Sequence, residues 1–350
     1  MNPLILTISI TSLLLGTTMT FIASHWLLIW VGLEINTMAI IPLMIYQHHP
    51  RATEATTKYF LTQATASALL LFATTTNAWL TGQWQLTEMT NQTSITLLST
   101  ALALKIGLAP LHFWLPEVLQ GLNLMTGLII STWQKLAPFA VLLQLYPLMN
   151  PTLLLSMGML SIVIGGWGGI NQTQLRKILA YSSIAHLGWM LIILPYSPHL
   201  TLLNLIIYIT MTSSMFLLFN TSNTTNINSI TTSSTKSPLL ITMTMMTLLS
   251  LGGLPPLTGF MPKWLILSEL TKQSLFIPAT ITALMTLISL FFYLRLCYSI
   301  TLTISPNPIT SSSTWRSKTR QPNLALATMT SSSILLLPLT PTLLSLLTIT

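Results

Sequence analysis

Long apolar segments, separated by short polar intervals, run along nearly the whole chain. Because a helix rises about 1.5 Å per residue, about 20 apolar residues cross a bilayer core of about 30 Å. Eleven segments approach or exceed that length and predict an all-α polytopic membrane protein. The predicted spans are residues 3–22, 25–46, 57–80, 95–119, 123–146, 150–170, 178–195, 200–220, 238–270, 275–298 and 323–347.

Two of these segments contain related proline-rich stretches. They read Lys105-Ile-Gly-Leu-Ala-Pro-Leu-His-Phe-Trp-Leu-Pro-Glu117 and Gly253-Leu-Pro-Pro-Leu-Thr-Gly-Phe-Met-Pro-Lys263. Five positions agree, namely Gly107 with Gly253, Leu108 with Leu254, Pro110 with Pro256, Leu111 with Leu257 and Pro116 with Pro262. A proline removes a backbone donor and crowds the preceding turn, so each segment is expected to be a helix broken mid-span.

The ninth segment is also too long for one straight helix. Its 33 residues, 238–270, would run to about 50 Å, so a break is expected at Pro255-Pro256. The broken segments are the fourth and the ninth, which cross in opposite directions and predict an inverted repeat, as in many secondary transporters. The expected organisation is one membrane domain with repeats at 1–146 and 150–298 and a C-terminal transmembrane helix at 323–347.

Composition excludes several function classes. The 350 residues are 51% hydrophobic and only 5% charged, against about 25% charged in a soluble domain, and mean hydropathy is +0.72. The basic residues are too scattered for a nucleic-acid surface, and no phosphate-binding loop is present. A single cysteine, Cys297, excludes an internal disulfide framework and any all-cysteine cluster or zinc site. The glycine-rich stretch 165–169 lies in an apolar run and predicts close helix packing.

Basic residues outside the spans predict the orientation. One side holds Arg51, Lys58, Arg176, Lys177, Lys236, Arg316, Lys318 and Arg320, and the other holds only Lys272. This asymmetry places the N-terminus on the positive, cytoplasm-like side and the C-terminus across the membrane. The stretches 220–237 and 305–321 are expected to be polar connectors. Neither a cleavable signal nor a transit peptide is evident, so an organellar protein of this kind would be inserted from inside the organelle.

Four ionisable residues are expected deep within spans: Glu34, Lys105, Lys135 and Lys263. Each charge at that depth costs roughly 2.5–3.5 kcal/mol, so the default hypothesis is function. Structural alternatives stay open, since Glu34 could be only a counter-ion for Lys105, Lys135 a neutral lysine that merely packs, and Lys263 a side chain that reaches the interface.

Two further residues are candidates for proton transfer. His186 lies within the seventh span, where it is either a structural histidine or part of a proton relay. Glu117 aligns with Lys263 and is the strongest candidate among the glutamates near span ends. Buried groups of alternating charge can pass protons by coupled titration, and because no redox or nucleotide site is visible, the energy must come from a partner.

At these residues the chain resembles a known family, the antiporter-like, proton-pumping subunit 2 of mitochondrial NADH:ubiquinone oxidoreductase (respiratory complex I). The resemblance covers essentially the whole chain. It rests on Trp30-Val-Gly-Leu-Glu34-Ile-Asn, on Lys105 to Glu117, on Leu179-Ala-Tyr-Ser-Ser-Ile-Ala-His186 and on Gly252 to Trp264. Bacterial relatives resemble fourteen-span proteins, so the resemblance implies that three N-terminal spans are missing here, and a partner subunit is expected to cover the surface left bare.

The resemblance implies a role for each candidate. Glu34 matches the glutamate that pairs with the lysine of the first broken helix, Lys105 matches that lysine, and Lys135 matches the central lysine of a polar axis. His186 matches the histidine of that axis, and Lys263 the lysine on the second broken helix. The family binds no metal, flavin, iron–sulfur cluster, quinone or NADH in this subunit, so FMN and the clusters are expected in partner subunits.

The resemblance also implies surroundings: the mitochondrial inner membrane, with the N-terminus on the matrix side and the C-terminus on the intermembrane-space side. Expected partners are lipids and the other membrane and accessory subunits of the complex, with no nucleic acid. Two other functions remain as alternatives, a stand-alone cation/proton antiporter and a structural subunit that no longer pumps.

Overall fold

The computed structural model describes residues 3–46, 48–233, 238–302 and 324–349, and these ranges contain helices and no strands. They form two compact units, Met1–Ser161 and Ile162–Thr350. The predicted positive residues Lys236, Arg316, Lys318 and Arg320 and the connector 305–321 lie outside the described residues. The all-α class predicted from the apolar segments is confirmed for the described ranges.

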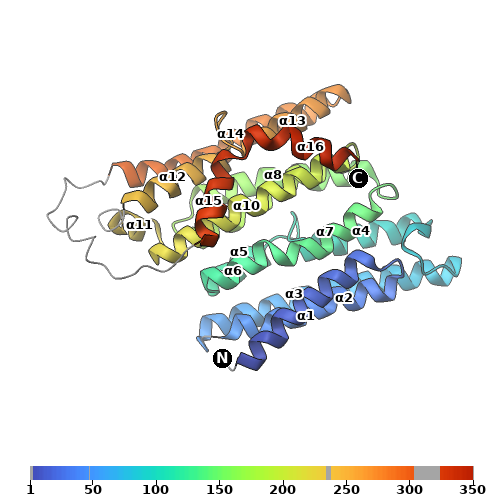
Figure 1. The fold of residues 1–350 in the computed structure, drawn as a ribbon. Coiled ribbons are helices and arrows are strands. Elements are labelled where there is room, and N and C mark those ends of the chain that lie inside the picture. Colours follow the sequence, from blue (N-terminus) through green and yellow to red (C-terminus); the bar gives the residue numbers. More distant parts are fainter. Residues whose placement is uncertain (1–2, 47, 234–237, 303–323, 350) are drawn as a thin grey trace. The chain divides into compact units, whose positions relative to one another are not determined.

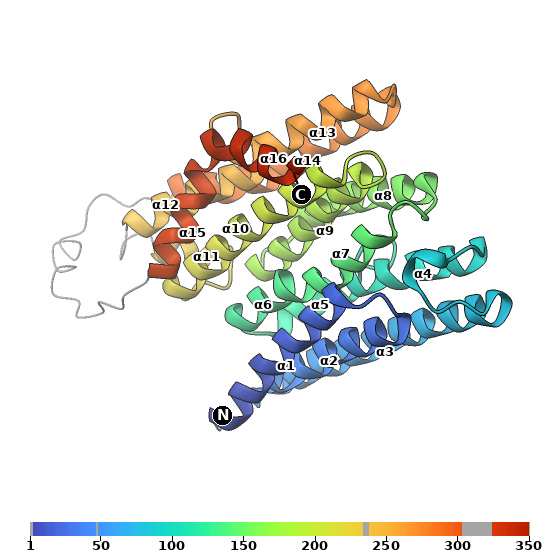
Figure 2. The ribbon, with the colours of Figure 1, turned by 45° about the vertical axis from the view of Figure 1, so that its right-hand side comes forward.

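The first unit is built on three long helices that lie side by side (Figures 1 and 2). They are α1 (Pro3–Ile22), α2 (Trp26–Ile45) and α3 (Pro50–Thr81), followed by α4 (Gln92–Ile106), α5 (Trp114–Gly121), α6 (Leu124–Ser131) and α7 (Trp133–Leu145). Glycines allow α1 and α2 to approach closely, since a Cβ on Gly16 would lie 2.9 Å from the carbonyl oxygen of Gly32. Helix α3 packs on α4 and α5, and α7 packs on α4, α1 and α2.

The second unit surrounds α10 (Pro198–Ser222), which contacts α9, α12, α13, α15 and α16. Its other helices are α9 (Leu175–Ile193), α11 (Ile227–Ser233), α12 (Pro238–Gly252), α13 (Phe260–Lys272), α14 (Phe276–Thr301), α15 (Leu324–Leu335) and α16 (Thr340–Ile349), and α8 (Pro151–Ile170) begins in the first unit. The predicted glycine packing is confirmed. A Cβ on Gly165 would lie 2.7 Å from the backbone nitrogen of Ala185 on α9, and one on Gly169 would lie 2.9 Å from the ring of Phe292 on α14.

Both predicted breaks are present. The fourth span divides into α4 and α5 around residues 107–113, and the ninth into α12 and α13 around 253–259, which contain Pro255-Pro256. Each first half is followed directly by a glycine in the left-handed region, Gly107 (φ 84°) and Gly253 (φ 81°). In both, the second residue after the helix donates to a carbonyl five positions back, which satisfies end carbonyls that the helix leaves free.

Three expectations need correction. The last segment is not one helix, because α15 and the helix that follows it are bent by 70° at Leu336–Leu339, where Pro338 cannot supply a backbone donor. The polar connector 220–237 contains a short helix, α11, and α10 extends into it as far as Ser222. Helix α3 begins at Pro50 rather than residue 57, because His49 caps its N-terminus by accepting from the backbone N–H of Arg51.

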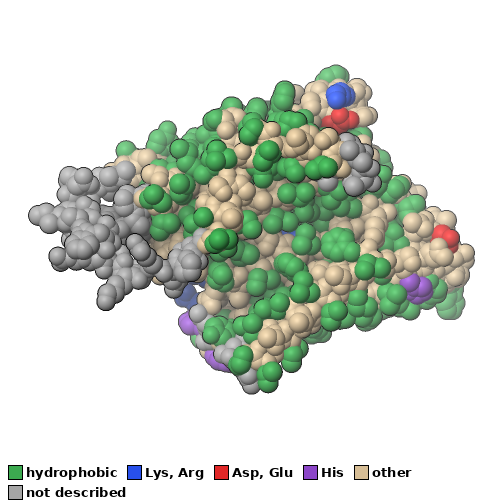
Figure 3. All heavy atoms as spheres, viewed as in Figure 1, with side chains coloured by type: hydrophobic (Ala, Val, Ile, Leu, Met, Phe, Trp, Pro, Cys, Tyr) green, Lys and Arg blue, Asp and Glu red, His purple; other side chains and the backbone are tan. Residues whose placement is uncertain are grey.

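The surface fits a membrane protein. Hydrophobic side chains are spread over the visible face in Figure 3, where charged groups are few, and Leu15, Leu61, Trp79 and Leu284 are each at least 60% exposed. Among the described residues, six helices are long and apolar enough to cross a membrane, or up to seven if the bent pair is one span.

Candidate functional site

Two of the predicted lysines line one small cavity in the first unit. Lys105 of α4 and Lys135 of α7 are each 5% exposed, and both line a cavity of about 10 Å³, which is room for about one water molecule. The other polar side chains that line it are Asn36, Thr37, Tyr59, Gln63 and Gln134. The cavity therefore joins residues from α2, α3, α4 and α7.

The break after α4 positions Lys105. The helix ends one residue beyond it, and Leu104 and Lys105 leave carbonyl oxygens that receive side-chain donors at 3.0 Å from Trp114 Nε1 and 3.5 Å from Gln63 Nε2. Its own amine, Lys105 Nζ, is buried and has no hydrogen-bond partner among the described residues. Lys105 thus places an amine at the cavity, where no protein atom among the described residues forms a hydrogen bond with it.

Lys135 reaches the same cavity from a second interrupted helix. Helix α6 ends at Ser131 and α7 begins at Trp133, and between them the Thr132 hydroxyl donates to the carbonyl of Leu128 at 2.7 Å. The next residue but one, Gln134, donates through Nε2 to the backbone carbonyl of Asn36 at 3.0 Å. That bond ties α7 to α2 beside the cavity.

Glu34 is not in this cavity. It is half-buried on α2 and lines an adjoining apolar groove of about 440 Å³ between α1 and α2. Among the described residues no ion pair within 4.0 Å joins it to Lys105, although it lies within electrostatic range of that lysine. Its Oε2 instead accepts a hydrogen bond from the Thr37 hydroxyl at 3.0 Å. Glu34 and Lys105 therefore make no contact ion pair among the described residues, and whether Glu34 serves as the counter-ion of Lys105 stays a prediction.

The other two predicted residues belong to the second unit. His186 of α9 is 6% exposed, and its ring centroid lies 5.7 Å from that of Tyr208 on α10. Tyr208 and Tyr293 are fully buried and interact with Ser183 and Ser182 of α9, respectively. Sequence reasoning singled out the histidine but missed these tyrosines and serines, which make the surroundings polar.

Lys263 stands on the first turn of α13 and turns back to the end of α12. Its Nζ donates to the carbonyl oxygens of Gly252 at 2.8 Å and Leu251 at 3.5 Å. A cation suits this position because the C-terminal end of a helix carries partial negative charge. The alternative in which Lys263 extends to an interface is not what the structure shows.

Arg295 was overlooked, although it lies within the predicted tenth span. Its Nη1 donates to the carbonyl of Ile170, the last residue of α8, at 2.5 Å. The same signal that found the lysines, a cation in an apolar segment, was available for it. No group of three or more His, Cys, Asp or Glu side chains that could hold a metal ion occurs in the part of the chain that the structure describes.

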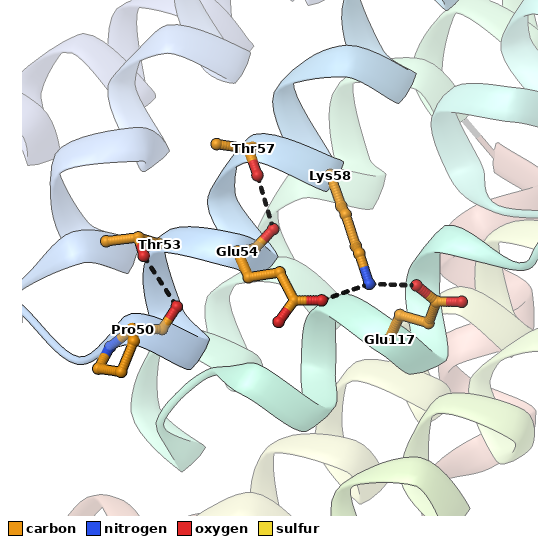
Figure 4. A network of polar contacts seen from close by, with 6 residues as sticks. All are labelled: Pro50, Thr53, Glu54, Thr57, Lys58 and Glu117. Carbon is orange, nitrogen blue, oxygen red and sulfur yellow. Dashed lines mark hydrogen bonds and ion pairs between the residues drawn. The ribbon is translucent and has the colours of Figure 1, made fainter.

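Glu117 belongs to a surface network (Figure 4). Lys58 of α3 lies between two carboxylates, with Nζ at 2.7 Å from Glu54 Oε1 and 2.8 Å from Glu117 Oε2 on α5. The hydrogen bond from Lys58 lowers the pKa of the Glu54 carboxyl. All three side chains are well exposed, so the network is a weak tie between α3 and α5 rather than a buried site.

The chain is similar in sequence to known proteins. The family model described as NADH:quinone oxidoreductase/Mrp antiporter, TM matches residues 23–289, and the one described as NADH dehydrogenase subunit 2 C-terminus matches residues 290–344. NADH-ubiquinone oxidoreductase chain 2 of Squalus acanthias is 73% identical over 98% of both chains. The same-named protein of Scyliorhinus canicula is 72% identical over 99% of this chain and 100% of that one.

Solved structures agree with these matches. A chain of respiratory complex I from Thermus thermophilus has a TM-score of 0.81 and 28% identity, covering 93% of this chain and 75% of that one. Together with the buried lysines and the two broken helices, these similarities show that the chain belongs to the family of NADH-ubiquinone oxidoreductase chain 2, an antiporter-like membrane subunit.

Proposed function

We propose that the chain is the proton-translocating subunit 2 of respiratory NADH:ubiquinone oxidoreductase. Electrons pass from NADH to ubiquinone in other subunits, and this chain moves protons across the inner mitochondrial membrane. The relatives named above support the assignment to that enzyme, and the buried cavity supports the proton role.

One observation carries the mechanism: Lys105 and Lys135 line the same small cavity, which has room for about one water. The amine of Lys105 has no protein acceptor there among the described residues, so a water in the cavity can exchange a proton with it. A proton can then pass from one lysine to the other without leaving the first unit. We propose that Glu34 supplies protons to this pair and that His186 and Lys263 serve the second half of the path.

We further propose the finer architecture, eleven spans in two inverted repeats, 1–146 and 150–298, followed by a C-terminal segment at 323–347. The left-handed glycines after α4 and α12, and the matching hydrogen bonds to a carbonyl five residues back, support a repeat. The basic residues Arg51, Lys58, Arg176 and Lys177 support an N-terminus on the matrix side and a C-terminus on the intermembrane-space side. FMN, the iron–sulfur clusters and the quinone and NADH sites are assigned to partner subunits.

The test replaces Lys105 or Lys135 by methionine in the assembled complex reconstituted in vesicles. Methionine keeps an unbranched side chain but cannot carry a proton. We expect normal assembly on native gels, with slower NADH oxidation and fewer protons pumped per NADH. Lys272→Met is the matched control, because that lysine is 71% exposed. Wild-type pumping in both variants would overturn the proposal, and failure only through lost assembly would indicate a structural spacer.

A stand-alone antiporter is distinguished by a separate measurement. The chain alone would then exchange cations for protons in vesicles without the rest of the complex. We expect no exchange, because the relatives belong to a multi-subunit enzyme.

A further inference from the structure

Two spaces in the first unit are separated by one turn of α2. Glu34 lines the groove, which opens between α1 and α2, and Lys105 and Lys135 line the small cavity. Thr37 lines the cavity, whereas Glu34, three residues earlier, lines the groove. Residues three apart on a helix are neighbours on its surface, so Thr37 stands between the carboxyl group and the lysines.

The Thr37 hydroxyl has two acceptors for its one hydrogen. It lies 2.8 Å from the backbone carbonyl of Glu34 and 3.0 Å from Glu34 Oε2. Buried threonines usually bond only to a carbonyl of their own helix, as Thr74 does to Leu71 at 2.9 Å. Thr37 therefore couples to a titratable group, and rotation about one bond changes which oxygen its hydrogen faces.

The cavity on the other side of Thr37 lacks a partner for its polar groups. Asn36 is 1% exposed, and neither atom of its side-chain amide has a hydrogen-bond partner among the described residues, as is also true of Lys105 Nζ. Buried polar groups in native proteins are almost always bonded to protein or to ordered water. Asn36 and Lys105 both line the cavity, which has room for about one water molecule, and that water would be a partner for Lys105 Nζ.

We propose that Thr37 is a relay that passes protons between Glu34 and a water molecule held beside Asn36 and Lys105. The O–H bond of the protonated Glu34 carboxyl breaks as its proton bonds to Thr37 Oγ1. The original Thr37 hydroxyl proton passes to the water, and the water passes a proton to the neutral Lys105 amine. Thr37 ends as a hydroxyl, one proton has moved from Glu34 to Lys105, and no electron is transferred. In the structure Thr37 Oγ1 lies within hydrogen-bond distance of both the backbone carbonyl and Oε2 of Glu34, the carboxyl oxygen with which the proton is exchanged.

This inference rests on the proposed function. If Thr37 had only a structural role, a side chain of the same shape could replace it without loss of pumping. Thr37→Val keeps the shape of the side chain and removes the hydroxyl, whereas Thr37→Ser keeps the hydroxyl. In the assembled complex in vesicles, we expect Thr37→Val to slow coupled NADH oxidation about tenfold and to lower the number of protons pumped per NADH. Thr37→Ser should retain most of both.

Matched variants separate the possible outcomes. Thr74→Val, also at a buried threonine of the first unit, should pump normally because its hydroxyl bonds to a backbone carbonyl rather than to a titratable side chain. If Thr37→Val pumps like wild type, or Thr37→Ser fails as badly as Thr37→Val, the relay is wrong. Lys105→Met, measured alongside, tests the proposed function separately. Its loss of pumping together with normal pumping in Thr37→Val would overturn only the relay, and normal pumping in Lys105→Met would overturn the parent proposal.

The solvent isotope effect gives a second readout. A hydroxyl that carries protons in the slow step should make coupled turnover slower in D₂O, and Thr37→Val should change the size of that effect. A valine that merely disturbed packing would lower turnover equally in both solvents, and that result would overturn the relay.

Discussion

The ammonium group of Lys263 donates to the carbonyl oxygen of Gly252 at 2.8 Å, which places a cation on the C-terminal end of α12. Gly252 is the last residue of that half-helix, and the Lys263 side chain reaches it from the first turn of α13. The corresponding end of α4 receives neutral donors instead, from Trp114 and Gln63. The two breaks thus share a left-handed glycine and a hydrogen bond to a carbonyl five residues back. They differ in the side chains that donate to the end of the first half-helix, which is a lysine at α12 and neutral groups at α4.

Removing this cap should destabilise the second unit. Lys263→Met loses both the hydrogen bonds and the charge, at a cost of about 1–2 kcal/mol, and Lys263→Gln, which keeps a donor, should cost less. The measurement is the thermal midpoint of the purified complex. Equal midpoints for the methionine variant and wild type would contradict the capping role.

The left-handed glycine beside this cap gives a second prediction. At Gly253 (φ 81°), a Cβ would lie 2.9 Å from Lys263 Nζ, whereas at Gly82 (φ 74°) a Cβ would meet nothing within 4 Å. Both alanine variants pay for the unfavourable φ, about 1–2 kcal/mol. Gly253→Ala should lower the thermal midpoint further than Gly82→Ala, because only there must the lysine also move. A larger loss at Gly82 would contradict this account.

The glycine stretch on α8 gives a third prediction, which compares two neighbouring glycines of the same helix. A Cβ on Gly165 would lie 2.7 Å from the backbone nitrogen of Ala185, whereas on Gly166 its nearest neighbour would be 3.5 Å away. Gly165→Ala should separate α8 from α9 and reduce the yield of assembled complex. Gly166→Ala should assemble normally, since that contact distance is ordinary. Native gels of the two variants decide the question, and equal yields would contradict it.

Hydropathy alone predicted much of the fold, because burial in lipid needs continuous apolar length. Helix α1, Pro3–Ile22, has the predicted limits of the first span, and both proline-rich segments are interrupted where expected. The bend after α15 was missed although Pro338 lies in the segment, because apolar length was weighed above the proline. The position of a proline shows where a helix can end. Whether the helix ends there depends on how the segment packs.

The site was less predictable than the fold. Lys105 and Lys135 are conspicuous because a charge in an apolar segment is costly, and in the structure both line one cavity. Thr37 could not be recognised, because threonine is frequent within these segments and normally bonds to its own helix. Thr37 is distinguished by the spaces on either side of it, which arise from the packing of α1, α3 and α7 on α2.

Asn36 provides a prediction that separates stability from function. It is 1% exposed, and its unbonded side-chain amide costs about 1–3 kcal/mol unless a water satisfies it. Asn36→Leu has a similar volume and no polar atoms, so the thermal midpoint should stay equal or rise, while proton pumping slows because the cavity water loses a partner. Asn77→Leu is the control, since Asn77 is 0% exposed and its Oδ1 also lacks a partner, but it does not line the cavity. Pumping at the wild-type rate in Asn36→Leu would show that the amide does not hold the transferring water.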